Sequence, residues 1–308
     1  MARRRKGRAI NGWLVIDKPL GVTSTDVVNR VRRKLDARKV GHGGTLDPLA
    51  TGLLPLAFGE ATKTVAYVME GDKTYRFTLR WGVATTTDDA EGEVVATSDI
   101  RPDRAAIEAV LPQFQGLVSQ VPPAFSAIKV DGQRAYDLAR DGEQVELSAR
   151  PVRIDRLVLA DQPDADHAVF ECDCGKGTYM RSLARDLGEA LGTRAHIATL
   201  RRLAVGPFEE ADAISLDSVE TLEHVARAEE LLLPVEAALD DIPALTLTEA
   251  EALRLKSGQP ISMLARSNAG RIRDLESGDV VCATSGGKPV AISRFEGGEL
   301  RPVRVLNL

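Results

Sequence analysis

The chain has 308 residues, of which 44% are hydrophobic and 28% charged, a balance typical of folded globular proteins that excludes a fully disordered chain. It contains no run of about 18 uncharged apolar residues, so no segment is expected to cross a membrane as a helix. The formal net charge of −5, taken alone, argues against a nucleic-acid partner.

The charge is distributed unevenly along the chain. Residues 1–40 carry a net charge of +9 and residues 207–241 carry −10, so the chain without that acidic segment is net positive. This separation predicts a basic surface for an anionic partner, with the acidic segment turned away from it. The basic residues 3–8 precede only four apolar residues, too few for a secretory signal. Three cysteines predict a reduced, cytoplasmic protein without disulfides.

The N-terminal part is expected to begin with a basic, disordered arm over residues 1–10. A short buried strand over residues 12–17 follows, and then a helix over residues 24–35 with Ser24 as its N-cap. Residues 40–59 contain five glycines and two prolines and follow neither a helical nor a strand period. They are predicted to form a long loop, and loops of this length in compact domains are usually functional.

Two later segments alternate between apolar and polar residues and predict half-buried strands. In residues 73–80, Tyr75, Phe77 and Leu79 share one face, and residues 168–174 have the same period. Helices are predicted over residues 102–111, 134–141 and 180–191. This mixture, without regular strand–helix alternation, predicts an α+β fold with a mixed, largely antiparallel sheet flanked by helices.

The composition and pattern of the sequence change in the last third of the chain. The acidic segment 207–241 is expected to close the first domain and to lead to the next one. A short helix is predicted over residues 249–255, followed by short apolar runs that glycines separate. Frequent turns between short strands predict a small C-terminal β-barrel domain.

The sequence lacks the motifs of most cofactor-dependent enzymes. Cys172 and Cys174 share one strand face but have no second cysteine or histidine pair at a zinc spacing, so we interpret them as core residues. No phosphate-binding glycine loop, dinucleotide-binding motif or serine nucleophile motif occurs. We therefore expect any chemistry to proceed without a metal or cofactor.

The glycine-rich loop contains a single acidic residue, Asp47, which is the only carboxylate between Asp36 and Glu60. It precedes Pro48, which favours an extended backbone at the aspartate. Such a residue is either a turn-forming aspartate or a catalytic carboxylate, and the spacing alone slightly favours the turn.

Several segments, in order along nearly the whole chain, resemble the motifs of the TruB family. Members of this family are tRNA pseudouridine synthases that isomerise the uridine at position 55 in the T-arm loop. Residues 41–56, GHGGTLDPLATGLLPL, are similar to the family signature. The other similar segments are residues 16–24, 73–75, 122–140, 176–183 and 200–202.

The resemblance implies the pseudouridine synthase fold in a catalytic domain over residues 11–240, with an RNA-gripping insertion at about residues 120–152. Residues 241–308 are then a PUA-like RNA-binding domain. The implied partner is tRNA, through its T-arm stem-loop, and the implied enzyme is a monomer that needs no cofactor, metal or membrane.

The reaction implied by the resemblance breaks the bond between uracil N1 and ribose C1′, turns the base and rejoins it through C5. Asp47 matches the family's essential aspartate, which either attacks C1′ or removes the C2′ proton, and the sequence leaves both routes open. Arg181 is implied to pair with Asp47, and Tyr75 to stack on the uracil. The other implied substrate-binding residues are Lys18, His42, Arg140, Lys176, Tyr179 and Leu200.

Two of these residues have a more specific implied role. His42 is implied to insert where the target base leaves the RNA loop. Lys18 is implied to support the active-site loop or to contact an RNA phosphate. The chain departs from the family at residues 85–87, Thr-Thr-Thr, where Thr-Asp-Thr is usual. Asp88 and Asp89 are the candidates to replace the missing acid.

Two other functions compete with this interpretation. An RNA-binding or tRNA-folding module, whose output is binding alone, would use the same basic N-terminal half and PUA-like tail. A glycoside hydrolase would need two carboxylates at a defined separation, and the loop motif supplies only Asp47.

Overall fold

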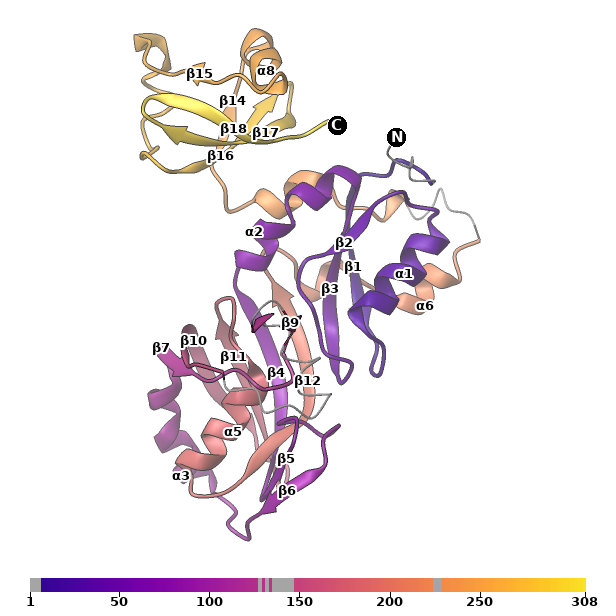
Figure 1. Cartoon of the computed structure of the whole chain (residues 1–308), viewed down its shortest axis with the longest axis vertical. Helices are drawn as coiled ribbons and strands as arrows, with labels where there is room; N and C mark the ends of the chain where they lie inside the picture. The colour runs from indigo at the N-terminus through magenta and orange to yellow at the C-terminus, as the bar shows by residue number, and fades with distance from the viewer. Residues whose placement is uncertain (1–6, 127–128, 131–132, 135–146, 224–228) are drawn as a thin grey trace.

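The computed structural model describes residues 7–126, 129–130, 133–134, 147–223 and 229–308. The chain forms a large mixed sheet with helices and, at its C-terminal end, a smaller five-stranded sheet with one helix (Figure 1). This arrangement confirms the predicted α+β fold.

Nine strands form the large sheet: β1 (Gly12–Lys18), β2 (Val40–His42), β3 (Ala50–Phe58), β4 (Lys73–Trp81), β7 (Gly116–Gln120), β10 (Arg150–Asp161), β11 (His167–Cys174), β12 (Ala195–Val205) and β13 (Ala213–Ser215). Their order is β13-β1-β3-β12-β4-β11-β10-β7, with β2 paired to β3. Only β1 with β13 and β3 with β12 are parallel pairs, so the sheet is largely antiparallel as predicted.

Helices cover both faces of this sheet. One face packs against α1 (Ser24–Lys34), α3 (Arg104–Val110), α5 (Met180–Ala190) and α6 (Leu216–Glu220). The other face packs against α2 (Val65–Glu70) and the 3-10 turn η4 (Val235–Leu239). The remaining short helical turns of this part are η1 (Gly59–Lys63), η2 (Leu111–Phe114) and η3 (Glu210–Asp212).

The segment predicted as one loop over residues 40–59 is a loop only at residues 43–49, because β2 and β3 occupy the rest. Leu54 and Leu56 of β3 join the core on one face, whereas Leu53 and Ala57 join the core on the other. A strand that is buried on both faces shows no alternation, and the strand period is therefore missing from the sequence. The two strands predicted from alternation are confirmed as β4 and β11, and the structure pairs them with each other.

The first helix begins one residue away from the predicted cap. Thr23, and not Ser24, is the N-cap, since its side chain accepts a hydrogen bond from the Asp26 amide at 3.1 Å. Ser24 is buried, and its hydroxyl both donates to the Leu46 carbonyl and accepts from the Leu46 amide, each at 2.9 Å. Ser24 thus ties α1 to the residue that precedes Asp47.

One larger expectation also needs correction. Within the arm predicted to be disordered over residues 1–10, the described residues are held in place, because the Arg8 amide donates to the Asp36 carbonyl at 2.6 Å and Ile10 is buried. Residues 1–6 lie outside the described residues. The acidic segment 207–241, which is expected to close the first domain, supplies β13 to the large sheet and α6, which lies beside α1 (Figure 1).

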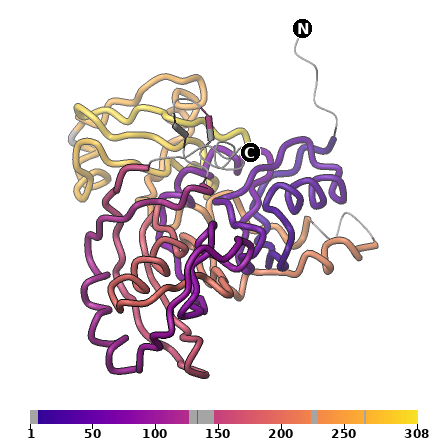
Figure 2. The backbone as a smooth tube through the Cα atoms, turned by 60° about the horizontal axis from the view of Figure 1, so that its bottom comes forward, coloured from indigo at the N-terminus to yellow at the C-terminus, as the bar shows by residue number. Residues whose placement is uncertain are grey.

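The C-terminal sheet contains β14 (Ala244–Thr246), β15 (Ile261–Ser262), β16 (Val280–Ser285), β17 (Lys288–Glu296) and β18 (Glu299–Val305), and it packs with α8 (Glu249–Lys256). A short turn, η5 (Arg266–Asn268), lies between β15 and β16 in the chain. The chain end returns to the first part (Figure 2). Leu306 is buried there, Lys63 donates to the Val305 carbonyl at 2.7 Å, and the Asn307 amide donates to Glu60 at 2.7 Å. The boundary predicted at residues 240–241 falls between η4 and β14.

Two pairs of short strands stand apart from both sheets: β5 (Val83–Thr85) with β6 (Val94–Thr97), and β8 (Lys129–Val130) with β9 (Gln133–Arg134). The segment that connects β5 to β6 contains Asp88 and Asp89. The helix predicted over residues 134–141 lies almost entirely outside the described residues, as do residues 127–128, 131–132 and 135–146 of the predicted insertion.

Candidate active site

A cavity of about 320 Å³ opens where the loop at residues 43–49 meets the middle of the large sheet and the start of α5. Its wall is partly apolar and holds one carboxylate and one guanidinium, with tyrosines on two sides. The lining residues are Thr45, Leu46, Asp47, Ala50, Tyr75, Phe125, Ser126, Thr178, Tyr179, Met180, Arg181 and Leu200. The cavity therefore brings together five residues that the sequence singled out separately: Asp47, Tyr75, Tyr179, Arg181 and Leu200.

Asp47 and Arg181 form an ion pair in this wall. Nη2 of Arg181 lies 3.0 Å from Oδ2 of Asp47, and the side chain of Arg181 is 7% exposed whereas that of Asp47 is 40% exposed. A guanidinium held rigidly in a partly buried site fixes the direction of a bound carboxylate and compensates its charge. The other side of the carboxylate remains open to the cavity.

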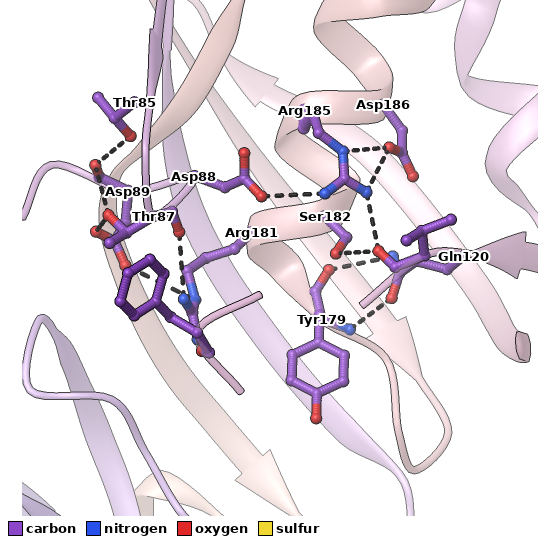
Figure 3. A network of polar contacts seen from close by, with 12 residues as sticks. Thr85, Thr87, Asp88, Asp89, Gln120, Tyr179, Arg181, Ser182, Arg185 and Asp186 are labelled. Carbon is purple, nitrogen blue, oxygen red and sulfur yellow. Dashed lines mark hydrogen bonds and ion pairs between the residues drawn. The ribbon is translucent and has the colours of Figure 1, made fainter. Parts of the chain in front are cut away.

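Arg181 also has three further partners (Figure 3). Nη1 donates to the Thr87 carbonyl at 3.2 Å and Nη2 donates to the Phe125 carbonyl at 2.8 Å. Nε lies 3.7 Å from the carboxylate of Asp89, whose side chain is only 4% exposed. Arg181 therefore lies between two carboxylates, one that faces the cavity and one that is buried.

Asp89 is the site residue that the sequence did not resolve. The sequence marked Asp88 and Asp89 equally as replacements for a missing acid, and the structure separates them. Asp89 lies beside Arg181, whereas Asp88 binds Arg185 one turn further along α5 at 3.1 Å (Figure 3). Asp88 has a φ of 60°, a left-handed backbone that turns these neighbouring carboxylates toward different arginines.

Tyr75 and Leu200 come from the adjacent strands β4 and β12. Leu200 is paired with Phe77, two residues after Tyr75, and it is almost fully buried. Burial raises the pKa of Tyr75, so its hydroxyl keeps its proton at neutral pH. Tyr179 caps the N-terminus of α5, and the side-chain amide of Gln120 binds both its amide, at 2.8 Å, and its carbonyl, at 3.1 Å.

Lys18 is fully buried below the loop and does not line the cavity. Its ammonium donates to the carbonyls of Pro19 at 3.0 Å, Val22 at 2.6 Å and Pro48 at 3.2 Å. Two roles are implied for Lys18, loop support and contact with an RNA phosphate, and this geometry favours loop support. A buried ammonium with three carbonyl partners is not available to a phosphate. Burial lowers the pKa of Lys18 to about 8, against the opposite effects of the Asp47 and Glu91 carboxylates.

Three further residues named from the sequence lie outside the cavity wall or outside the described residues. His42 ends β2, half-buried, and burial together with the charge of Arg202 lowers its pKa. Lys176 is exposed and forms an ion pair with Glu70. Arg140 lies outside the described residues.

The described residues of the acidic segment 207–241 contribute nothing to the cavity wall, in agreement with the expected charge separation. The segment does, however, contact the basic face of α1. Glu220 lies 3.7 Å from Arg30, and its carbonyl accepts a hydrogen bond from Lys34 at 2.6 Å. The basic residues that line open surface pockets here are Arg30, Arg32 and Arg33 of α1, with Arg38 and Lys39 beyond the helix.

The residues that the structure describes contain no group of three or more histidine, cysteine or acidic side chains arranged to hold a metal ion. They also contain no helix that is both long and apolar enough to cross a membrane. Cys172, Cys174 and Cys282 are free and buried.

The chain is similar to known proteins along its whole length. Residues 32–180 match the family model "TruB family pseudouridylate synthase (N terminal domain)", and residues 181–240 match "tRNA pseudouridylate synthase B C-terminal domain". Proteins named tRNA pseudouridine synthase B from Rhodospirillum rubrum and Caulobacter vibrioides are 58% and 57% identical, and each alignment covers 100% of both chains.

A solved structure has the same fold at low sequence identity. The crystal structure of the archaeal box H/ACA sRNP Nop10–Cbf5 complex contains a chain that superposes with a TM-score of 0.73 at 22% identity, over 96% of this chain and 86% of that one. Together, the two family models and the full-length relatives show that the chain belongs to the TruB family of pseudouridylate synthases.

Proposed function

We propose that this pseudouridylate synthase acts on tRNA and converts the uridine at position 55 of the T-arm loop to pseudouridine, with Asp47 as the catalytic carboxylate. The observation that carries the proposal is the ion pair between Asp47 and Arg181 in the wall of a partly apolar cavity. The names of the full-length relatives support tRNA as the substrate.

The proposed reaction begins with cleavage of the bond between uracil N1 and ribose C1′. Asp47 either attacks C1′, forming a sugar–enzyme ester, or takes the C2′ proton, leaving a glycal-like sugar. In both routes the freed uracil anion turns within the cavity. C5 then either displaces the Asp47 carboxylate from C1′, or bonds to C1′ of the glycal while Asp47 returns its proton to C2′. In both routes a base takes the proton from C5 and N1 gains a proton. Arg181 holds the Asp47 carboxylate charged and aimed in either route.

The walls of the cavity suit a flat, uncharged base. Tyr75 is proposed to stack on the uracil, with Tyr179 and Leu200 as the remaining walls. The target base must leave the stacked RNA loop, which costs a few kcal/mol that contacts in the cavity have to offset. His42 is proposed to fill the vacated place, and its lowered pKa makes it a neutral ring at pH 7.

Recognition of the tRNA is proposed to use shape and phosphate contacts, with a strong dependence of affinity on salt. Arg32, Arg33, Arg38 and Lys39, which form no ion pair within the described part of the chain, are candidates for the phosphate contacts. The C-terminal sheet is proposed to be a PUA-like RNA-binding domain, and the enzyme is proposed to act as a monomer in the cytoplasm.

The test is chemical mapping of pseudouridine in a tRNA transcript incubated with the enzyme, with a transcript that carries cytidine at position 55 as the control. We expect a single signal at position 55 of the first transcript and none in the second. Modification elsewhere, with position 55 left as uridine, would contradict the proposed target.

A further inference from the structure

Arg202 is a buried cation directly behind the cavity. It lies on β12 two residues after Leu200, and only 1% of its surface is exposed. Nε donates to the Leu53 carbonyl at 2.8 Å, and Nη2 donates to the Gly44 carbonyl at 3.1 Å. One planar group therefore binds the backbone both before and after Asp47.

The loop between these two carbonyls is also packed tightly against Arg202. Gly52 is paired with Arg202 in the sheet, and a Cβ atom at position 52 would lie 2.1 Å from the Arg202 carbonyl oxygen. Gly44 has a φ of 122°, and a Cβ atom there would lie 3.3 Å from Nη1 of Arg202. Both glycines permit the close approach that Arg202 makes to each end of the loop.

Arg202 also interacts with Tyr75, another residue of the cavity wall. Tyr75 is its partner on the adjacent strand β4, and the two side chains share one face of the sheet. The charge of Arg202 and a hydrogen bond from it lower the pKa of the Tyr75 hydroxyl, against the larger effect of burial. Arg202 is thus in contact with the structural elements that carry Asp47 and Tyr75.

The absence of a nearby carboxylate makes this residue unusual. Among the residues that the structure describes, no carboxylate lies within the ion-pair distance of 4.0 Å from Arg202. A buried cation without a counter-charge is costly, and hydrogen bonds have to compensate for the lost hydration. The neighbouring Arg201 differs: it binds Asp17 at 2.9 Å and Glu210 at 2.7 Å, and its side chain is 35% exposed.

We propose that Arg202 is a positioning residue for the isomerisation, which fixes the Asp47 loop at both ends and holds it in register with Tyr75. The inference rests on the proposed role of Asp47. Arg202 does not touch the substrate in this scheme, because it lies behind the cavity wall and not in it.

The test changes two neighbouring arginines to lysine, one at a time. Arg202→Lys keeps the buried charge but offers a single nitrogen, which cannot bind two carbonyls with the spacing of a guanidinium. Arg201→Lys is the matched control on the same strand. Each variant is measured for single-turnover pseudouridine formation, RNA affinity and hydrogen exchange at the amides of residues 43–53, beside the wild type and Asp47→Asn.

We expect Arg202→Lys to slow the single turnover about a hundred-fold, the effect of a displacement of about 1 Å at a catalytic group, with RNA affinity within about threefold of wild type. Exchange should accelerate at residues 43–53 and stay unchanged in β10 and β11. Arg201→Lys should leave both the rate and the loop exchange within about twofold of wild type.

Equal rates in the two lysine variants would overturn the inference, and so would faster exchange across the whole sheet. Loss of the fold in both Arg202→Lys and Arg202→Met would overturn it as well, because Arg202 would then be required for folding and not for the geometry of the loop. Activity retained by Asp47→Asn would refute the proposed role of Asp47, and the inference with it, whatever the arginine variants do.

Discussion

Arg181 binds Asp47 at 3.0 Å, and the guanidinium is buried while the carboxylate faces the cavity. The arginine comes from the first turn of α5 and the aspartate from the loop before β3, so the pair joins two elements that are distant in the chain. A buried donor that is already bound to two carbonyls cannot follow the carboxylate if it moves. The orientation of the Asp47 carboxylate is therefore set by Arg181, which α5 and the two carbonyls hold in place.

Arg181→Lys should slow pseudouridine formation about a hundred-fold, because one ammonium cannot replace a group that binds Asp47, Asp89 and two carbonyls together. Single-turnover kinetics with saturating enzyme measure the change. Arg185→Lys, one turn further along α5 and bound to Asp88, is the matched control and should retain the wild-type rate within about threefold. A similar loss in both variants would point to a damaged helix.

Asp89→Asn tests the buried carboxylate behind Arg181. The asparagine keeps the shape and can still accept the hydrogen bond that the Glu91 amide donates at 3.0 Å, but it removes the negative charge beside Nε. We expect a fall in single-turnover rate of about ten-fold with unchanged RNA affinity, since one charged contact to the guanidinium is weakened. Asp88→Asn is the control, and an equal effect of the two changes would contradict a specific role for Asp89.

Activity should fall as the pH rises through about 8, where the buried Lys18 loses its proton. The neutral amine has two N–H donors for three carbonyl acceptors, so the support of the Asp47 loop weakens. The titration of Lys18 has the opposite effect on stability. Because the pKa is lower in the folded state, the unfolded chain binds more protons between about pH 8 and 10.5, and this group makes the free energy of unfolding rise over that interval.

The measurement is a pH profile of the single-turnover rate, with thermal melting at each pH to show that the fold persists. Lys18→Met removes the titrating group and should abolish the decline near pH 8, although its rate is lower throughout. If Lys18→Met shows the same decline as the wild type, another group is responsible.

Strand prediction succeeded where a strand has one buried face and failed where both faces are buried. In β4 the residues Tyr75, Phe77 and Leu79 point toward one core while Arg76 and Arg80 are exposed, so the period of two is visible in the sequence. In β3 nearly every residue is buried, and the glycines and prolines of the segment were therefore interpreted as a loop. β13, within the acidic segment, is a strand of three residues with no alternation of its own, so it was not predicted as an element.

The site divides in the same way. Asp47, Tyr75 and Arg181 followed from motif resemblance, and the structure brings them to one cavity. Asp89 was named only as one of two alternatives, and Arg202 only as part of the segment 200–202 without a role of its own. Their environment depends on pairing between β12, β3 and β4 and on a left-handed turn at Asp88. Nothing in the local sequence distinguishes the buried Arg202 from its surface neighbour Arg201.

The most direct test of the account is the single-turnover reaction of Asp47→Asn with a tRNA transcript, measured together with its affinity for the same transcript. The asparagine keeps the size of the side chain but cannot act as a nucleophile or a base, so we expect no pseudouridine at position 55. Affinity should stay within about threefold of wild type, because the proposed phosphate and loop contacts to the RNA lie elsewhere. Pseudouridine formed by Asp47→Asn at a rate near that of the wild type would contradict the account.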